Sequence, residues 1–254
     1  MQSNWTAKEK ELLESRSRFL FEKPKSEKGV PLSVFLEPAA FSAFLKKEAG
    51  RIGSDNTKVA ASIFIKRYAF LLVGVLASWS FFRKPFFFSP QAIWLVDDGH
   101  LDAWRPKFFL DEAVCRQKHG RIEEALYHMN AVIESAKEAT GISSAILREN
   151  LAVYIFWLYE TVAEEKELSA VSKRAKIDFM WLLAPEQASL FGGDEANLLA
   201  AYFKEKEAIE GQKKPLRIRS TCCLNVKLKT GGKRCSVCPI QNKTDCSEGR
   251  KRAY

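Results

Sequence analysis

The 254-residue chain contains little glycine and proline, with 13 and 9 residues of each type. This scarcity excludes a collagen-like or low-complexity protein. Hydrophobic residues make up 46% of the chain, which excludes an intrinsically disordered protein. The length is sufficient to bury one large hydrophobic core or two smaller ones.

The N-terminus lacks the apolar core and the small-residue cleavage site of a secretory signal. The longest uncharged apolar run, residues 68–82, has fifteen residues, fewer than the roughly 20 needed to cross a bilayer. We therefore expect a buried core helix and no membrane span. The expected location is the cytoplasm, with peripheral attachment to the inner face of the membrane as an alternative.

Histidine is scarce as well. His100, His119 and His128 all lie outside the C-terminal fifth of the chain, and none shows the spacing of a metal-ligand pair. Their absence from that region excludes a Rieske-type iron–sulfur site there. The chain also lacks a Gly-x-Gly-x-x-Gly fingerprint after a strand, so we expect no bound NAD or flavin.

Helical periodicity dominates the first two hundred residues. Thr6 and Glu9 have the spacing of a capping box, which opens a helix. Apolar residues at helical spacing from residue 122 onward predict a helix that ends at Gly141. The other predicted helices cover residues 35–45, 58–82, 151–159, 168–183 and 194–209.

One segment breaks this pattern and predicts a β-hairpin near residues 92–105. Apolar strands at 92–96 and 101–104 flank an Asp98-Gly99 pair, which favours the tight turn of a hairpin. Asp97, Asp98 and Asp102 are therefore expected to be turn residues rather than metal ligands. The predicted fold is mainly α with a small β element (α+β), a helical body with this hairpin and a short C-terminal module.

The net charge of +9 lies entirely in the last fifth of the chain. Residues 201–254 contain fourteen Lys and Arg against five Asp and Glu, while residues 1–200 are neutral. Five of the six cysteines lie in the same segment, and helical periodicity stops at Gly211. We therefore divide the chain into a helical body (1–210), expected to carry the substrate-binding surface, and a basic C-terminal segment (211–254).

Two pairs of cysteines stand in the C-terminal segment, Cys222-Cys223 and Cys235-x-x-Cys238, with eleven residues between them. In a reducing compartment, clustered thiols usually bind metal or perform redox chemistry. A Gly-Gly pair between them provides a flexible turn. Four thiolates suit a soft metal, with zinc and a two-iron cluster as candidates. Adjacent cysteines point to opposite faces of an extended chain, so they fit one small zinc ion poorly and a wider cluster better.

Basic residues stand on both sides of the cysteines and would offset the negative charge of a thiolate cluster. Four thiolates, two ferric ions and two sulfides carry about −2, and one more electron makes about −3. Nearby cations would favour the reduced form of such a cluster. The candidates are Arg217, Arg219, Lys227, Lys229, Lys233 and Arg234.

The C-terminal motif, RIRSTCC followed by CSVCP, resembles that of the FhuF-type ferric-siderophore reductases. These cytoplasmic proteins hold a [2Fe–2S] cluster on an unusual Cys-Cys…Cys-x-x-Cys pattern at the C-terminus. The resemblance covers about 20 residues. The eleven residues between the pairs are one more than the family's usual spacing.

The resemblance implies Cys222, Cys223, Cys235 and Cys238 as ligands of a [2Fe–2S] cluster. It also implies an enzyme that reduces siderophore-bound Fe(III) to Fe(II) by one-electron transfer, which releases the iron. The substrate would be a ferric siderophore of the hydroxamate or citrate-hydroxamate type. A separate donor such as a ferredoxin or a flavin reductase would supply the electrons, and no catalytic residue beyond the cluster is implied.

Two other functions stay open. A nucleic-acid-binding protein with a basic, zinc-stabilised tail would show the same charge. Tyr254 is the only aromatic residue after Gly211, however, which leaves no stacking surface for bases, so we expect no nucleic-acid partner. The second is a noncatalytic iron–sulfur sensor.

The remaining candidates have ordinary structural explanations. We expect Cys246 to be a thiol that does not bind the cluster and Cys115 to be a small packing residue. The basic residues 250–252 are expected to form a solvated terminus. Large apolar fillers, one or two of which could line a siderophore pocket, are Trp94, Trp104, Trp157 and Trp181.

Overall fold

The computed structural model describes residues 5–23, 29–97, 104–111 and 120–240. The predictions for Asp98, Gly99, His100, Asp102, Cys115, His119, Cys246, Tyr254 and residues 250–252 lie outside this part of the chain. The structure is mainly helical, with 58% helix and a small mixed sheet, which confirms the predicted α+β class.

The α-helices are α1 (Ala7–Ser17), α2 (Pro38–Lys47), α3 (Ala49–Ile52), α4 (Thr57–Ser80), α6 (Ile122–Thr140), α7 (Ser144–Glu160), α8 (Ser169–Leu183) and α9 (Leu198–Tyr202). Short 3-10 turns, η1 (Leu32–Leu36), η2 (Val162–Glu164), η3 (Lys166–Leu168), η4 (Pro185–Phe191) and η5 (Asn225–Lys227), lie between or after them.

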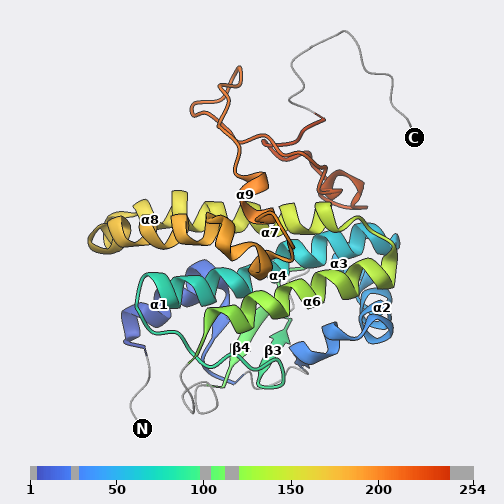
Figure 1. Ribbon diagram of the computed structural model, residues 1–254. Helices are drawn as coiled ribbons and strands as arrows, with labels where there is room; N and C mark the ends of the chain where they lie inside the picture. The colour runs from blue at the N-terminus through green and yellow to red at the C-terminus, as the bar shows by residue number, and fades with distance from the viewer. Residues whose placement is uncertain (1–4, 24–28, 98–103, 112–119, 241–254) are drawn as a thin grey trace.

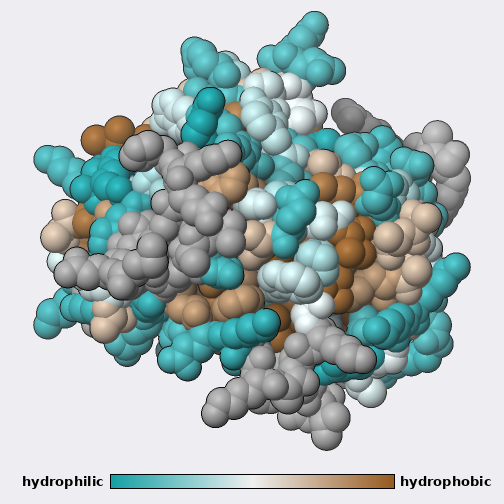
Figure 2. All heavy atoms as spheres, turned by 90° about the horizontal axis from the view of Figure 1, so that it is seen from below, coloured by the Kyte–Doolittle hydropathy of each residue, from teal (hydrophilic) through white to brown (hydrophobic). Residues whose placement is uncertain are grey.

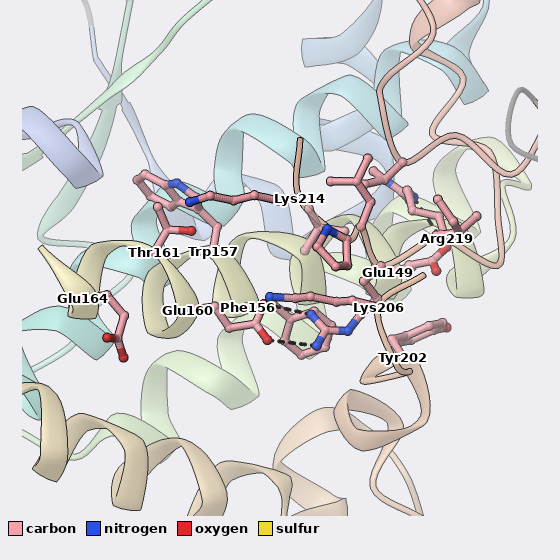
Figure 3. A pocket seen from close by; sticks show the side chains of 16 residues that line it. Glu149, Phe156, Trp157, Glu160, Thr161, Glu164, Tyr202, Lys206, Lys214 and Arg219 are labelled. Atoms are coloured by element: carbon pink, nitrogen blue, oxygen red, sulfur yellow. Dashed lines mark hydrogen bonds and ion pairs between the residues drawn. The ribbon is translucent and has the colours of Figure 1, made fainter. Parts of the chain in front are cut away.

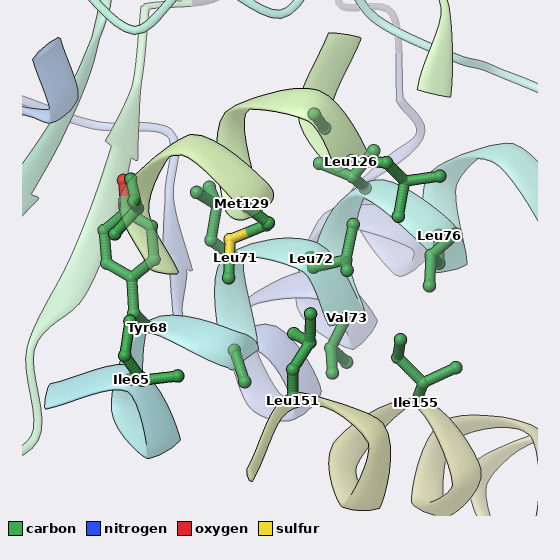
Figure 4. Close-up of a cluster of buried hydrophobic side chains, with 14 of the residues drawn as sticks. Ile65, Tyr68, Leu71, Leu72, Val73, Leu76, Leu126, Met129, Leu151 and Ile155 are labelled. Carbon is green, nitrogen blue, oxygen red and sulfur yellow. The ribbon is translucent and has the colours of Figure 1, made fainter. Parts of the chain in front are cut away.

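Helix α4 is the centre of the fold. It packs between α6 and α7, with α1 also against it (Figure 1). Side chains of α4 reach both neighbours, Leu126 and Met129 of α6 as well as Leu151 and Ile155 of α7 (Figure 4). By length and composition α4 could cross a membrane, but 83% of its most apolar 18-residue window is buried within the fold. It therefore occupies the core, as the sequence predicts.

Several helix ends confirm the sequence pattern. The Thr6 side chain accepts the Glu9 backbone N–H while the Glu9 carboxylate accepts the Thr6 N–H, which completes the capping box. Gly141 ends α6 in the left-handed conformation, with φ of 66°.

The helix predicted over 194–209 is confirmed only over α9, Leu198–Tyr202, and is wrong before and after it. Residues 204–208 are all exposed, so a helix there would have no apolar face to bury. The chain instead folds back on itself, and Glu207 and Leu216 pair through two backbone hydrogen bonds of 2.8 Å.

The small sheet has the order β1-β4-β3-β2, with β1 (Phe19–Leu20), β2 (Val30–Pro31), β3 (Ile93–Val96) and β4 (Lys107–Leu110). Strands β3 and β4 are antiparallel, with Ile93 opposite Leu110, so a strand pair exists where the hairpin is predicted. The strand that pairs with β3 lies at 107–110, however, whereas the predicted second strand at 101–104 lies mostly outside the described residues. Phe108 and Leu110 are fully buried while Lys107 and Phe109 are half-buried, and this alternation places the strand after Pro106.

The sheet and the C-terminal segment lie on opposite sides of the helical layers (Figure 1). Figure 2 views the molecule from the sheet side and shows hydrophobic residues reaching the surface between hydrophilic ones. Trp94 of β3 keeps 37% of its surface exposed. The residues after α9 instead run along α4 and α7, and this arrangement positions the cysteines.

Candidate metal centre

The C-terminal segment brings its two cysteine pairs together. The thiols of Cys223 and Cys235 share a hydrogen bond, and Cys238 is close enough to Cys235 to interact with it electrostatically. Cys223 and Cys238 are buried, while Cys222 and Cys235 are half-buried. The Cys-x-x-Cys turn is closed by the Cys238 N–H, which donates to the Cys235 carbonyl at 3.0 Å. Residues from separate pairs therefore meet, as the spacing predicts.

The four cysteines offer soft thiolate donors, which suit either zinc or an iron–sulfur cluster. Among the residues that the structure describes, no three Cys, His, Asp or Glu side chains are grouped as a metal-binding set. One zinc ion requires four ligands at a single point. A two-iron cluster would spread its four thiolates over two metal ions, so the thiols would not all need to meet at a single point.

A cation from the helical body stands beside these thiols. Lys66 Nζ of α4 lies 3.8 Å from Cys223 Sγ and 3.4 Å from Asn225 Oδ1. The hydrogen bond from Cys235 lowers the pKa of Cys223, and the charges of Lys66 and Arg219 add to this effect against the opposing effect of burial. The same hydrogen bond, together with burial, raises the pKa of Cys235. The site thus stabilises negative charge at Cys223.

A buried ion pair fixes the loop that leads into the first cysteine pair. The Glu149 carboxylate of α7 accepts the backbone N–H groups of Ser220 and Thr221 at 2.6 and 2.7 Å. It also accepts the Thr221 hydroxyl and lies 3.5 Å from Arg219 Nε. Both charged side chains are only 4% exposed. Because one buried carboxylate accepts all these groups, the loop is anchored to one point on α7.

A second network joins this ion pair to α4. Arg219 Nη2 donates to Asn150 Oδ1 at 2.7 Å, and Asn150 Nδ2 donates to the Ser62 hydroxyl at 2.9 Å. The Ser62 hydroxyl in turn donates to the Cys223 carbonyl at 2.8 Å. The backbone of Cys223 is therefore tied to both central helices.

Sequence reasoning missed Ser62, Lys66, Glu149 and Asn150. A signal was present, because Ser62 and Lys66 stand four residues apart and so share one face of an otherwise apolar helix. Glu149 and Asn150 likewise stand directly before an apolar run. The missing information was the partner, because nothing local shows that the C-terminal segment returns to these helices.

The basic residues of the C-terminal segment separate into groups. Arg219 faces the thiols, as predicted. Arg217 instead forms a two-pronged ion pair with Glu160 at 2.8 and 2.9 Å, and Lys229 pairs with Asp55. The charges of these two are therefore matched by carboxylates of the helical body. Lys227, Lys233 and Arg234 are exposed.

The loop between the cysteine pairs depends on its two glycines. Gly231 has φ of 66°, a conformation that residues with a side chain rarely adopt. A Cβ on Gly232 would lie 2.8 Å from the Leu228 carbonyl oxygen and 3.1 Å from that of Val226. The predicted Gly-Gly turn is thus present, and it brings the second pair back toward the first.

Two hollows adjoin the centre, and their linings share Val153, Trp157, Arg219 and Val237. The larger has a volume of about 560 Å³ and contains carboxylates, among them Glu160 and Glu164 (Figure 3). Burial alone would raise the pKa of Glu160, but hydrogen bonds from Arg217 and Lys206 outweigh burial and lower it. No cysteine among the described residues lines this hollow.

The second hollow, with a volume of about 470 Å³, is lined by the Cys223 and Cys235 side chains themselves. Of the four tryptophans singled out in the sequence, Trp157 alone appears in the described lining of either hollow. Trp104 is buried, and Trp181 contacts Trp79 on the α8 side of the fold. His128 is also buried, with its Nε2 2.7 Å from the Tyr68 hydroxyl.

Comparison with known proteins adds no identification. No protein-family model matches the chain, and no curated protein matches it. The resemblance to the FhuF-type reductases therefore rests on the motif residues alone.

Proposed function

We propose that the chain is an enzyme that reduces siderophore-bound Fe(III) to Fe(II) by one-electron transfer. In this proposal Cys222, Cys223, Cys235 and Cys238 hold a [2Fe–2S] cluster, with no bound NAD or flavin. The observation that supports it most is the meeting of two thiols from separate pairs, beside Lys66, at the edge of an open hollow. When bound, an all-thiolate cluster of this type supplies single electrons at low potential, near about −400 mV in plant-type ferredoxins.

The chain's own residues would hold and tune this centre. Lys66 and Arg219 would offset the negative charge of the thiolates, which favours the more negative, reduced state. Glu149, Asn150 and Ser62 would fix the loop so that the thiols keep their relative positions. The Fe(III) of the substrate gains one electron and becomes Fe(II). Hard oxygen ligands bind Fe(II) more weakly than Fe(III), so the siderophore releases the iron. The electron comes from a separate donor, such as a ferredoxin or a flavin reductase.

The pairing of the basic residues bears on the nucleic-acid alternative. Arg217, Arg219 and Lys229 each pair with a carboxylate of the helical body. Phosphate contacts need cations that face outward and can displace counterions. Within the described part of the segment these three cations are therefore less available to phosphate than the composition suggests, which counts against a polyanion-binding tail.

Chemical reduction of a ferric chelate by the protein tests the proposal. Protein purified and reduced without oxygen is mixed with ferric citrate and with a ferric trihydroxamate, and Fe(II) is followed with a colorimetric trap. We expect Fe(II) to form with at least one chelate. Cys223→Ser and Cys235→Ser should abolish it, while Cys246→Ser, a change at the cysteine not assigned as a ligand, should not. Cluster-loaded protein that yields no Fe(II) from any chelate would instead be a sensor.

A further inference from the structure

We infer that the hollow bordered by Cys223 and Cys235 is the substrate site, and that it selects chelates with net negative charge, such as those bearing citrate-type carboxylates. This inference rests on the proposed function, because it names the site and the class of chelate for that reaction. The evidence for it is the set of side chains that line this hollow and the difference between that set and the lining of the neighbouring, carboxylate-containing hollow.

Apart from the two cysteines, the charged side chains that line the hollow are all of one sign. Four cations line it, Arg16, Arg18, Lys66 and Arg219, and no carboxylate stands among the described lining residues. Arg219 is matched by Glu149, and Arg16 Nη2 is 2.9 Å from a Glu165 oxygen. Arg16 is nonetheless 43% exposed and keeps further N–H groups for a ligand. Lys66 contacts a thiol and a neutral amide, so its positive charge is directed at the hollow's edge.

The shape and the apolar lining suit a small chelate. The volume of about 470 Å³ falls within the range of small-molecule sites. Phe70, Tyr154 and Trp157 provide aromatic surface beside the cations, and the Arg18 guanidinium lies 3.9 Å from the centre of the Phe70 ring. A ligand in this hollow would rest against the two cysteine side chains, with no other element between them.

The neighbouring hollow provides the comparison. It is similar in size, shares Trp157 and Arg219 with the cysteine-bordered hollow and also contains other cations, but Glu149, Glu160 and Glu164 line it too (Figure 3). Its Lys206 resembles Arg16 closely, because it is paired with one carboxylate at 3.0 Å and is 42% exposed. Lys206 therefore serves as a matched control for Arg16, with similar exposure and pairing but no cysteine at its hollow.

Binding of a redox-inert chelate separates the site from the reaction. Gallium(III) citrate has the metal charge of the ferric complex but accepts no electron, and its affinity for the cluster-loaded protein can be measured by calorimetry. We expect Arg16→Gln to weaken binding about tenfold, the loss of one charge-assisted contact. Lys206→Gln should leave the affinity unchanged, and the cationic gallium complex of desferrioxamine B should bind more weakly than the citrate. The EPR signal of each reduced variant should match that of the parent.

The inference is overturned if gallium citrate does not bind, if Arg16→Gln binds as the parent does, or if Lys206→Gln is weakened equally. It is also overturned if Arg16→Gln affects only reduction by the electron donor, since the cations would then form a docking surface for a protein. All these results leave the proposed function standing as long as the protein holds its cluster and releases Fe(II). Absence of the cluster would instead reject the proposed function itself.

Discussion

At the scale of single residues, Glu149 and Arg219 are the most consequential pair outside the cysteines. Both are buried, and each also bonds to groups of the loop that leads into Cys222. A buried ion pair contributes little when intact, because desolvation of the two charges offsets their attraction. Removal of one partner is different, because it leaves the other charge buried without compensation.

Glu149→Ala should therefore lower the free energy of unfolding by about 3–5 kcal/mol and lower the iron content of the protein. The control is Asp55→Asn, which breaks the exposed pair with Lys229 between the same segment and the body. That change should cost less than about 1 kcal/mol. Urea unfolding and iron analysis measure both effects. Equal, small losses in the two variants would show that the buried pair does not anchor the segment.

His128 gives the protein a built-in acid sensitivity. Burial lowers its pKa to about 4, against an ordinary value of 6.5, so it stays neutral beside Tyr68 in the folded chain. The unfolded chain takes up a proton on this histidine at about pH 6.5. The contribution of neutral His128 to the free energy of unfolding is therefore complete above that pH and is lost as the pH falls toward 4. The loss attributable to His128 should reach about 3 kcal/mol.

His128→Gln should remove most of this pH dependence. The measurement is the free energy of unfolding by urea at pH 7 and at pH 5 for the parent and the variant. The parent should lose more stability than the variant between the two values. Identical losses would mean that another group dominates acid unfolding.

At the scale of elements, the sequence predicts those whose signals are local. The capping box at Thr6 and the end of α6 at Gly141 depend only on neighbouring residues, and both are confirmed. The Asp98-Gly99 pair predicts an early turn and a partner strand at 101–104, whereas β3 pairs with residues 107–110, where Phe108 and Leu110 are buried.

The residues of the candidate site likewise fall into those that the sequence predicts and those that only the structure shows. The cysteines and Arg219 stand in one short motif and can be read from it. Lys66 and Glu149 reach the site from helices 157 and 72 residues away in the chain, as their contacts with Cys223 and Thr221 show. The hydrophobic periodicity of a helix does not show which of its faces a distant segment packs against. These partners can therefore be identified only in the folded structure.

The loop between the cysteine pairs is the element most sensitive to a small change. Gly232→Ala places a Cβ against backbone oxygens, which cannot move as a side-chain tip can. We expect fewer irons per chain and a lower melting temperature. Gly50→Ala is the control, because a Cβ there meets nothing within 4 Å. Parental iron content in Gly232→Ala would show that the turn does not set the distance between the pairs.

At the scale of the whole molecule, ion pairs join the C-terminal segment to the helical body. The surplus charge of +9 belongs to residues 201–254, while the body supplies carboxylates that pair with several cations of the C-terminal segment. These pairs hold the segment across α4 and α7, on the side away from the sheet (Figure 1). The molecule is thus a helical platform that gives a short, cysteine-bearing segment a fixed shape, which so short a segment would lack alone.

The central claim is that the four C-terminal thiols hold an iron–sulfur cluster. The most direct test is purification without oxygen, followed by metal and sulfide analysis, visible absorption and EPR after reduction with dithionite. We predict a red-brown protein with about two irons and two sulfides per chain, whose visible bands bleach as an S = 1/2 signal appears. A colourless protein with about one zinc per chain, held by the same cysteines, would contradict it.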